Sequence, residues 1–181
     1  MDIFRDLYQQ LIIDHNKNPR NYHEMENASH RADGHNPLCG DEMTVFINEK
    51  DSRIDEISFT GSGCAISKAS ASIMTSTLKG MTLKEARTLF EDFIIMATTG
   101  ERNGDMGKLS VLGGVHKYPA RVKCATLAWH TFLGSLDDTK EIITAFFKEK
   151  NIFELINNII EANILKKNGI IVIHRNEKSK D

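Results

Sequence analysis

Two short segments with β-strand patterns lie between regions of helical periodicity, and this order restricts the chain to few architectures. Residues 43–48 (MTVFIN) and 54–60 (IDEISFT) are rich in β-branched and aromatic side chains, and the turn at 49–53 favours an antiparallel hairpin. Residues 29–33 are placed to supply a third strand. Because helix, strands and helices follow in blocks instead of alternating, the pattern predicts an α+β fold.

Helices are predicted on both sides of this hairpin from apolar spacing and from end signals. Thr82 and Glu85 have the spacing of a capping box, and Pro119 suits the first turn of a helix. A glycine-rich loop is expected at 100–114. The approximate bounds of the expected helices are residues 3–18, 64–80, 82–94 and 119–135.

The composition changes after Asp138, which divides the chain into a domain at 1–137 and a C-terminal extension at 138–181. Residues 142–147 and 152–165 have the apolar spacing of two amphipathic helices, and residues 169–174 (GIIVIH) have the pattern of a strand. The sequence predicts neither the role of this extension nor the oligomeric state.

Charge and hydropathy exclude two kinds of partner. A formal net charge of −2 argues against nucleic-acid binding, which normally leaves a basic patch. The apolar runs are only a handful of residues long, whereas a membrane span needs about 20. The first residues are acidic where a signal peptide has a basic start. We therefore expect a cytoplasmic protein, in a compartment that keeps thiols reduced.

Three cysteines are the strongest chemical signal in the chain. Cys39 lies in a loop close to Asp41, Cys64 follows a Gly-Ser-Gly break at the start of a helix, and Cys124 lies early in the helix at 119–135. Free cysteines are often simply buried, but a helix N-terminus favours a thiolate. Three thiolates and a carboxylate would suit Zn²⁺. Their spacing matches no simple zinc finger, so the residues alone leave a metal site and buried thiols equally open.

The motifs around these cysteines, NPLCGD, GSGCAISKASAS and PARVKCATLAW, resemble those of the NifU-like iron–sulfur assembly family, and DHNKNPRN at 14–21 resembles its N-terminal segment. The resemblance covers residues 2–136 in order. In the IscU-type scaffold branch a histidine directly precedes the third cysteine, whereas this chain has Lys123 there. The long stretch before Cys124 and the segment KYPARVK are similar to the SufU branch.

The resemblance implies a small antiparallel sheet of about three strands, covered by helices on one side. It also implies a zinc-dependent sulfurtransferase, which accepts a persulfide from a SufS-type cysteine desulfurase and passes sulfur to a downstream SUF scaffold complex. Cys39, Asp41, Cys64 and Cys124 match the zinc ligands of the SufU branch. Cys39 also matches the persulfide acceptor, and Arg121 matches an arginine that lies near the metal.

Two other functions stay open at this point. A scaffold for a [2Fe–2S] cluster would use the same cysteines, but Lys123 replaces the histidine that such a scaffold carries. A purely structural zinc module would not explain a Gly/Pro loop around one ligand. Lys123 itself fits a solvated helix lysine or a positive charge beside Cys124 equally well. The histidines His35, His116 and His130 are not expected to bind metal, because the four-ligand set is already complete.

Overall fold

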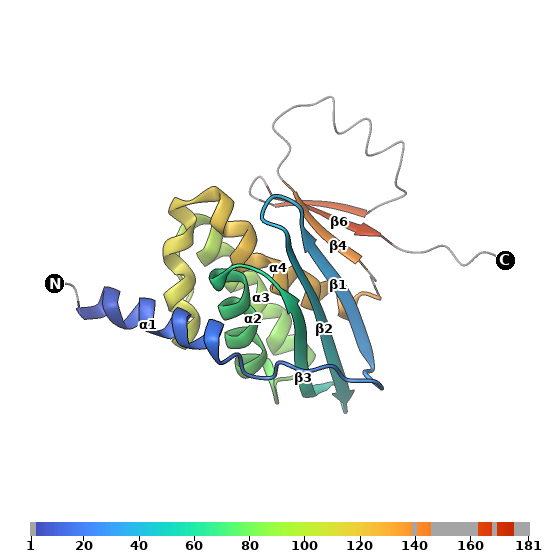
Figure 1. Cartoon of the computed structure of the whole chain (residues 1–181). Helices are drawn as coiled ribbons and strands as arrows, with labels where there is room; N and C mark the ends of the chain where they lie inside the picture. The colour runs from blue at the N-terminus through green and yellow to red at the C-terminus, as the bar shows by residue number, and fades with distance from the viewer. Residues whose placement is uncertain (1–2, 139–140, 146–162, 168–169, 176–181) are drawn as a thin grey trace, which may run out of the picture.

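The computed structural model describes residues 3–138, 141–145, 163–167 and 170–175. Figure 1 shows how their helices and strands are arranged. In chain order these are α1 (Ile3–Lys17), β1 (His30–Asn36), β2 (Asp41–Lys50), β3 (Arg53–Ser62), α2 (Ala65–Leu78), α3 (Leu83–Thr99), the 3-10 helix η1 (Gly107–Lys117), α4 (Pro119–Leu136), β4 (Glu141–Ala145), β5 (Asn163–Lys167) and β6 (Ile170–Arg175).

The strands of the described residues form one sheet of six, in the order β3-β2-β1-β4-β6-β5. Neighbouring strands are antiparallel except β1 and β4, which run parallel. The first three strands form the antiparallel sheet that the sequence predicted, and the others extend it on the β1 side (Figure 1). The α-helices lie on one side of β1–β3, so the predicted α+β class is confirmed.

The predicted hairpin between β2 and β3 turns at Asp51 and Ser52, whose φ angles are 52° and 58°. Two consecutive residues with positive φ match the right-handed twist of the flanking strands. The face of this hairpin towards the helices supplies much of the core. Its fully buried side chains are Val45, Ile47, Ile54, Ile57 and Phe59.

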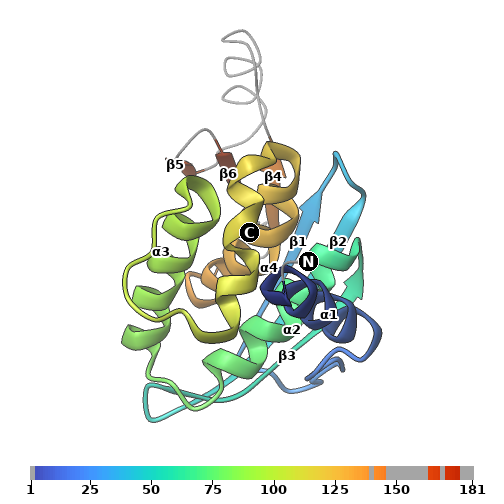
Figure 2. The same cartoon turned by 90° about the vertical axis from the view of Figure 1, so that its left-hand side faces the viewer.

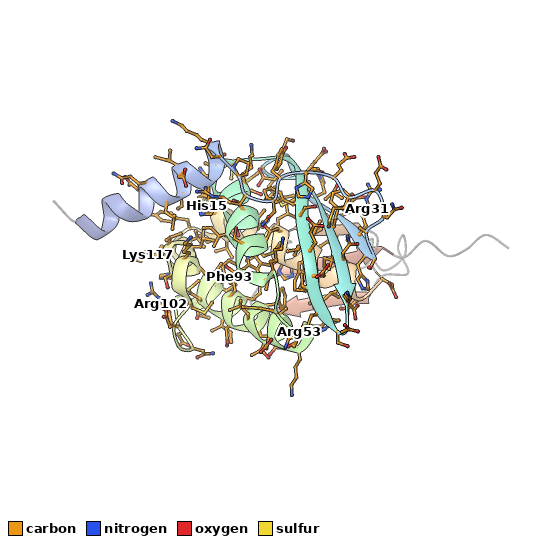
Figure 3. All side chains as sticks on the ribbon, turned by 90° about the horizontal axis from the view of Figure 1, so that it is seen from below. His15, Arg31, Arg53, Phe93, Arg102 and Lys117 are labelled. Carbon is orange, nitrogen blue, oxygen red and sulfur yellow. The ribbon has the colours of Figure 1, made fainter. Side chains whose placement is uncertain are left out.

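Helix α4 lies between α3 on one side and α1 and α2 on the other when the molecule is seen from the helical side (Figure 2). Its Trp129 is fully buried and stacks on Phe93 of α3, with ring centroids 4.2 Å apart. The Trp129 indole N–H donates to Ser70 Oγ of α2 at 3.2 Å. Figure 3 shows Phe93 inside this helical layer, with Arg31 on the sheet side of the molecule. Helix α4 is thereby fixed to both neighbouring helices.

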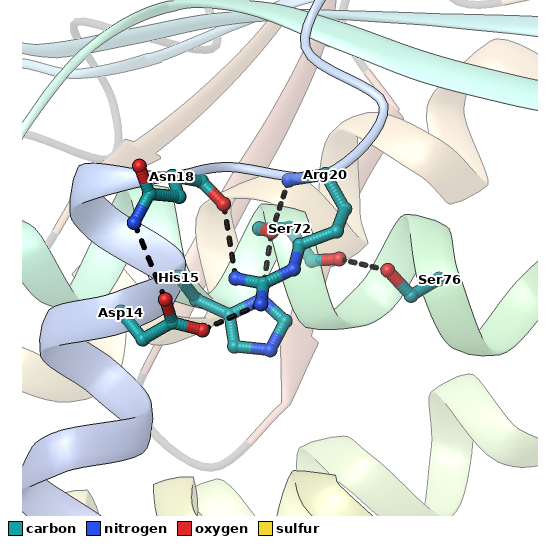
Figure 4. A network of polar contacts seen from close by, with 6 residues as sticks. All are labelled: Asp14, His15, Asn18, Arg20, Ser72 and Ser76. Carbon is teal, nitrogen blue, oxygen red and sulfur yellow. Dashed lines mark hydrogen bonds and ion pairs between the residues drawn. The ribbon is translucent and has the colours of Figure 1, made fainter.

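Helix α1 is attached to α2 by a polar network at its C-terminal end (Figure 4). His15 is 2% exposed, and its Nδ1 lies 2.7 Å from Ser72 Oγ. The same oxygen accepts the backbone N–H of Arg20 at 2.8 Å, and the Arg20 guanidinium pairs with Asp14. Burial holds the pKa of His15 below its ordinary value.

Gly34 of β1 allows α4 to approach the sheet closely. A Cβ atom at this position would lie 2.0 Å from Thr131 Oγ1 and 3.2 Å from Leu127 Cδ1. A side chain would therefore overlap α4, and glycine is required for packing here. As a result, the strand that leads to Cys39 lies directly against the helix that carries Cys124.

The expected glycine-rich loop is wrong in its second half, because residues 107–117 form η1. Leu109 and Leu112 of η1 are buried in the same core as α3 and α4. Their burial explains why this stretch is folded onto the body despite its glycines. No helix among the described residues is long and apolar enough to cross a membrane.

The helix expected at 142–147 is wrong, because residues 141–145 form β4. Ile142, Ile143 and Thr144 are β-branched and favour a strand, and the open side of β1 offers backbone groups that only a strand can pair with. Of the second expected helix, 152–162 lies outside the described residues and 163–165 belongs to β5. The strand expected at 169–174 is confirmed as β6. The domain boundary at 137/138 stays a prediction.

Candidate metal centre

Cys39 lies in the four-residue loop that joins β1 to β2. The register pairs Asn36 with Asp41 across the base of this loop. The Asn36 carbonyl accepts the N–H groups of Cys39 at 3.2 Å and of Gly40 at 2.9 Å, and Gly40 has a left-handed φ of 68°. Glycine adopts this conformation without steric cost, so the loop turns immediately after the thiol. Cys39 is therefore exposed on a short turn of defined shape.

Asp41 is the first residue of β2 and is fully buried. Its Oδ1 accepts the backbone N–H of Cys64 at 2.8 Å, while its Oδ2 is buried and has no hydrogen-bond partner among the described residues. A buried carboxylate oxygen without a donor is costly. Gly63 lies against this carboxylate, since a Cβ there would be 3.0 Å from Asp41 Oδ1. The Oδ2 atom is consequently available to a cation.

Cys124 lies in the second turn of α4 and is fully buried. Its sulfur lies 3.3 Å from Cys39 Sγ, within hydrogen-bonding distance of the two thiols. The same sulfur accepts a long hydrogen bond of 3.8 Å from Asn36 Nδ2. Helix α4 and the β1–β2 loop therefore bring together two thiols that are 85 positions apart in the sequence.

The ligand atoms of Cys39, Asp41 and Cys124 lie within 4.8 Å of one another. A tetrahedral zinc ion with bonds of about 2.0–2.3 Å holds its ligand atoms about 3.3–3.8 Å apart, so only small movements separate this group from a coordination shell. Two sulfurs and one carboxylate oxygen are a donor set that Zn²⁺ accepts. The Oδ2 atom without a donor supports the same interpretation, so the residues fit a metal ion.

Cys64 lies beside this group without belonging to it. It is the N-cap of α2, and its half-buried sulfur accepts the Ser67 N–H at 3.5 Å. A hydrogen bond from the Cys124 thiol and the N–H groups at the helix N-terminus lower the pKa of Cys64 to about 6. The hydrogen bond with Cys64 and the burial of the Cys124 thiol both raise the pKa of Cys124. The structure thus groups three of the four predicted ligands and places the fourth next to them, with a lowered pKa.

Lys123 is fully buried, so its interpretation as a solvated helix lysine is wrong. Burial lowers the pKa of Lys123, and negative charge on Cys39 and Cys124 acts in the opposite direction. The ammonium therefore lies within electrostatic range of both sulfurs. This arrangement agrees with the second interpretation, a positive charge beside the thiolates.

Arg121 is exposed at the start of α4, one helical turn before Cys124. Its backbone N–H donates to the Tyr118 carbonyl at 2.7 Å. Within the part of the chain that the structure describes, no hydrogen bond or ion pair involves its guanidinium. Its predicted place near the metal stays a prediction.

The three histidines that were set aside have other contacts. His35 faces Glu42 at 3.7 Å, and His116 Nδ1 lies 2.6 Å from the Gly113 carbonyl. His130 packs edge-on against Phe90. None of these histidines is in the group of Cys39, Asp41 and Cys124.

Sequence reasoning gave Asn36 no role, although its side chain contacts both halves of the site. Asn36 is fully buried, and its Oδ1 accepts the Leu38 N–H at 3.3 Å while its Nδ2 reaches Cys124. An Asn-Pro dipeptide before a cysteine and a glycine is a turn signal that could have pointed to this residue.

Comparisons with known proteins identify relatives over most of this region. The family model described as the NifU-like N-terminal domain matches residues 7–125. The zinc-dependent sulfurtransferase SufU of Bacillus subtilis is 42% identical over 125 residues, which cover 68% of this chain and 84% of that protein. The iron–sulfur cluster assembly scaffold protein IscU of Thermotoga maritima is 35% identical over 137 residues, 74% of this chain and 95% of that protein.

A solved structure gives a similar result. The crystal structure described as an iron–sulfur cluster assembly scaffold protein for the SUF system, from Fervidobacterium islandicum, is 32% identical, with a TM-score of 0.68. The match covers 73% of this chain and 98% of that chain. The family model therefore covers the region of all three cysteines, the solved structure shares the fold, and the names of the relatives include both sulfur transfer and cluster assembly.

Proposed function

Because the chain belongs to the NifU-like N-terminal domain family, an iron–sulfur cluster assembly family, we propose that it accepts sulfur from a cysteine desulfurase for cluster assembly. In this proposal Cys39, Asp41, Cys64 and Cys124 hold Zn²⁺, and Cys39 receives the sulfur as a persulfide. The desulfurase is of the SufS type, and the sulfur passes onward to a SUF scaffold complex. The SufU relative, named as a zinc-dependent sulfurtransferase, supports this assignment.

The observation that carries the proposal is the contrast in exposure between Cys39 and its neighbours. Cys39 is exposed on a loop, whereas Asp41 and Cys124 are fully buried on β2 and α4. Cys39 can therefore move towards a partner while the buried residues keep their places. A structural zinc site has no need for such an asymmetry.

When bound, Zn²⁺ would keep the cysteine ligands deprotonated near neutral pH. The chain's own residues then orient the acceptor. The Asn36 carbonyl and the left-handed Gly40 fix the direction in which Cys39 leaves the loop. Cys39 Sγ attacks the outer sulfur of the desulfurase persulfide, the sulfur–sulfur bond of the donor breaks, and the donor cysteine leaves as a thiolate. Lys123 balances negative charge on Cys39 and Cys124. Arg121 is exposed and available to contact the partner or the displaced thiolate.

The test combines metal analysis with a desulfurase assay. We expect about one zinc per chain and no visible absorbance, as a four-ligand zinc site requires. Cys39→Ala should abolish stimulation of the desulfurase by this protein while the circular dichroism spectrum stays native. Lys50→Ala, at the opposite end of β2, is the matched control and should stimulate normally. Full stimulation by Cys39→Ala would exclude Cys39 as the acceptor.

The second candidate function is a scaffold on which a [2Fe–2S] cluster is assembled. It is favoured by the relatives named as IscU scaffold proteins, which match 68% and 74% of the chain. Such a cluster would use the same cysteines, because the described residues offer no other group of cysteines. A brown protein that contains iron and sulfide after purification would support this function over sulfur transfer.

A further inference from the structure

The two sulfur atoms of Cys39 and Cys124 are in contact, and their surroundings differ sharply. They lie 3.3 Å apart, and a disulfide bond requires about 2.05 Å. Cys39 is exposed and lies on a loop beside Gly40, whereas Cys124 is fully buried in α4. Closing the bond therefore needs a movement of the loop and none of the helix.

We propose that Cys124 is the resolving thiol of Cys39 in the metal-free protein. Whenever the sulfur of Cys39 carries a leaving group, Cys124 attacks that sulfur and closes an intramolecular Cys39–Cys124 disulfide. Metal binding prevents this reaction because it occupies both sulfurs. The Cys39–Cys124 pair thus combines a metal site and a thiol switch in one place.

Exposure determines the order of the steps. A peroxide reaches Cys39 from solvent and not the buried Cys124. The Cys39 sulfur attacks one peroxide oxygen, the O–O bond breaks, and Cys39 becomes a sulfenic acid while the peroxide is reduced to water. Cys124 then attacks the Cys39 sulfur, and the hydroxyl group leaves as a second water with the Cys124 proton. Two thiols and one peroxide thus give one disulfide and two waters.

Cys64 is not placed for this role. Its sulfur lies outside the group formed by Cys39, Asp41 and Cys124, and it accepts the Ser67 N–H at the start of α2. The sulfur in contact with Cys39 Sγ is that of Cys124. Cys64 also shares a hydrogen bond with Cys124, but Cys39 is the exposed thiol and its sulfur lies 3.3 Å from that of Cys124. Exposure and distance together therefore favour the Cys39–Cys124 disulfide among the three that three cysteines allow.

The same attack applies to a persulfide on Cys39, and this part rests on the proposed function. Cys124 would attack the Cys39 sulfur, the sulfur–sulfur bond of the persulfide would break, and hydrogen sulfide would leave. No external oxidant is required, because the outer persulfide sulfur is reduced to hydrogen sulfide as the Cys124 sulfur is oxidised. A metal-free chain would therefore release its sulfur, whereas a metal-bound chain would retain it.

The test uses the full chain freed of metal by a chelator under reducing conditions, then treated with one equivalent of hydrogen peroxide. We expect an intact mass lower by two hydrogen atoms and a proteolytic peptide that links Cys39 to Cys124. Cys64→Ser should form the same link. Cys124→Ser and Cys39→Ser each remove one of the two sulfurs, so the link between positions 39 and 124 should be absent from both variants. Loading with Zn²⁺ before the peroxide should protect the thiols.

Three results would overturn the proposal: a Cys39–Cys64 link in the wild-type chain, sulfinic acid on Cys39 without any link, or links only between molecules. Circular dichroism before oxidation shows that each variant is folded, and Cys124→Ala serves as a second variant if the serine is poorly tolerated. The peroxide experiment uses no desulfurase, so its outcome is independent of the proposed function. Sulfide release from a metal-free chain treated with desulfurase and cysteine tests the persulfide step separately.

Discussion

Replacing Gly34 with alanine tests whether α4 is held at its present distance from β1 by the absence of a side chain. The new Cβ would lie 2.0 Å from Thr131 Oγ1, and ordinary van der Waals contact begins at 3.4 Å, so about 1.4 Å of displacement is needed. Thr131 Oγ1 also donates to the Leu127 carbonyl at 2.8 Å, which holds its rotamer. Overpacking of this kind costs about 1–3 kcal/mol.

We expect Gly34→Ala to lower the free energy of unfolding by this amount in urea with a chelator present, so that metal binding does not contribute. For a chain of this length the loss corresponds to a fall in Tm of about 2–12 °C. Gly114→Ala is the matched control, because its Cβ would meet nothing within 4 Å. It should leave stability unchanged or raise it by about 0.4–1 kcal/mol.

A double variant makes the steric argument specific. Thr131→Ala removes the atom that the new Cβ would meet, so Gly34→Ala should cost less in that background than in the wild type. Equal unfolding midpoints for Gly34→Ala and Gly114→Ala would refute the argument, and so would the absence of coupling with Thr131→Ala. In that event α4 would be held by other contacts, and Gly34 would have no packing role.

Two further predictions concern charge at buried sites. Asp41→Asn should weaken zinc binding by at least about tenfold in chelator competition, whereas Glu42→Gln, the exposed neighbouring carboxylate, should not; equal affinities would show that Asp41 is not a ligand. Burial keeps the pKa of His15 low, so the unfolded chain binds the proton first as pH falls. Stability is therefore full above about pH 6.5 and declines as pH falls towards the native pKa. Urea unfolding from pH 7.5 to 5 should show this decline in the wild type and less of it in His15→Gln, and parallel slopes would contradict it.

The first half of the fold was predictable because its signals are local. Alternation and β-branched residues marked β2 and β3, and the Thr82–Glu85 capping box formed as its spacing predicted. The strand at 141–145 was not, since its short apolar run fits a helix or a strand equally well. Pairing with the open edge of β1, over 100 residues earlier in the chain, determines that this segment forms a strand. No local pattern contains that information.

The candidate site likewise has features that the sequence predicts and features that depend on how the helices and strands pack. The loop around Cys39 and the helix start at Cys64 could be read from glycine and proline positions, but the contact between Cys39 and Cys124 depends on how α4 packs on β1. Lys123 shows the same limit, because a lysine in a helix is usually solvated and this one is fully buried. Lys123 is buried because α4 packs against the sheet and against the neighbouring helices, and that packing cannot be read from the residues around Lys123.

The parallel pairing of β1 with β4 covers backbone groups of β1 that would otherwise form an open edge of the sheet. Residues 33–35 of β1 are paired with residues 141–143 of β4, so their side of the strand is covered. A chain that stopped at the end of α4 would expose these backbone groups as an unpaired edge, which is a template for a strand of another molecule. The C-terminal strands therefore move this edge of the sheet from β1 to β5, and we expect a chain shortened at the end of α4 to be less soluble than the full chain.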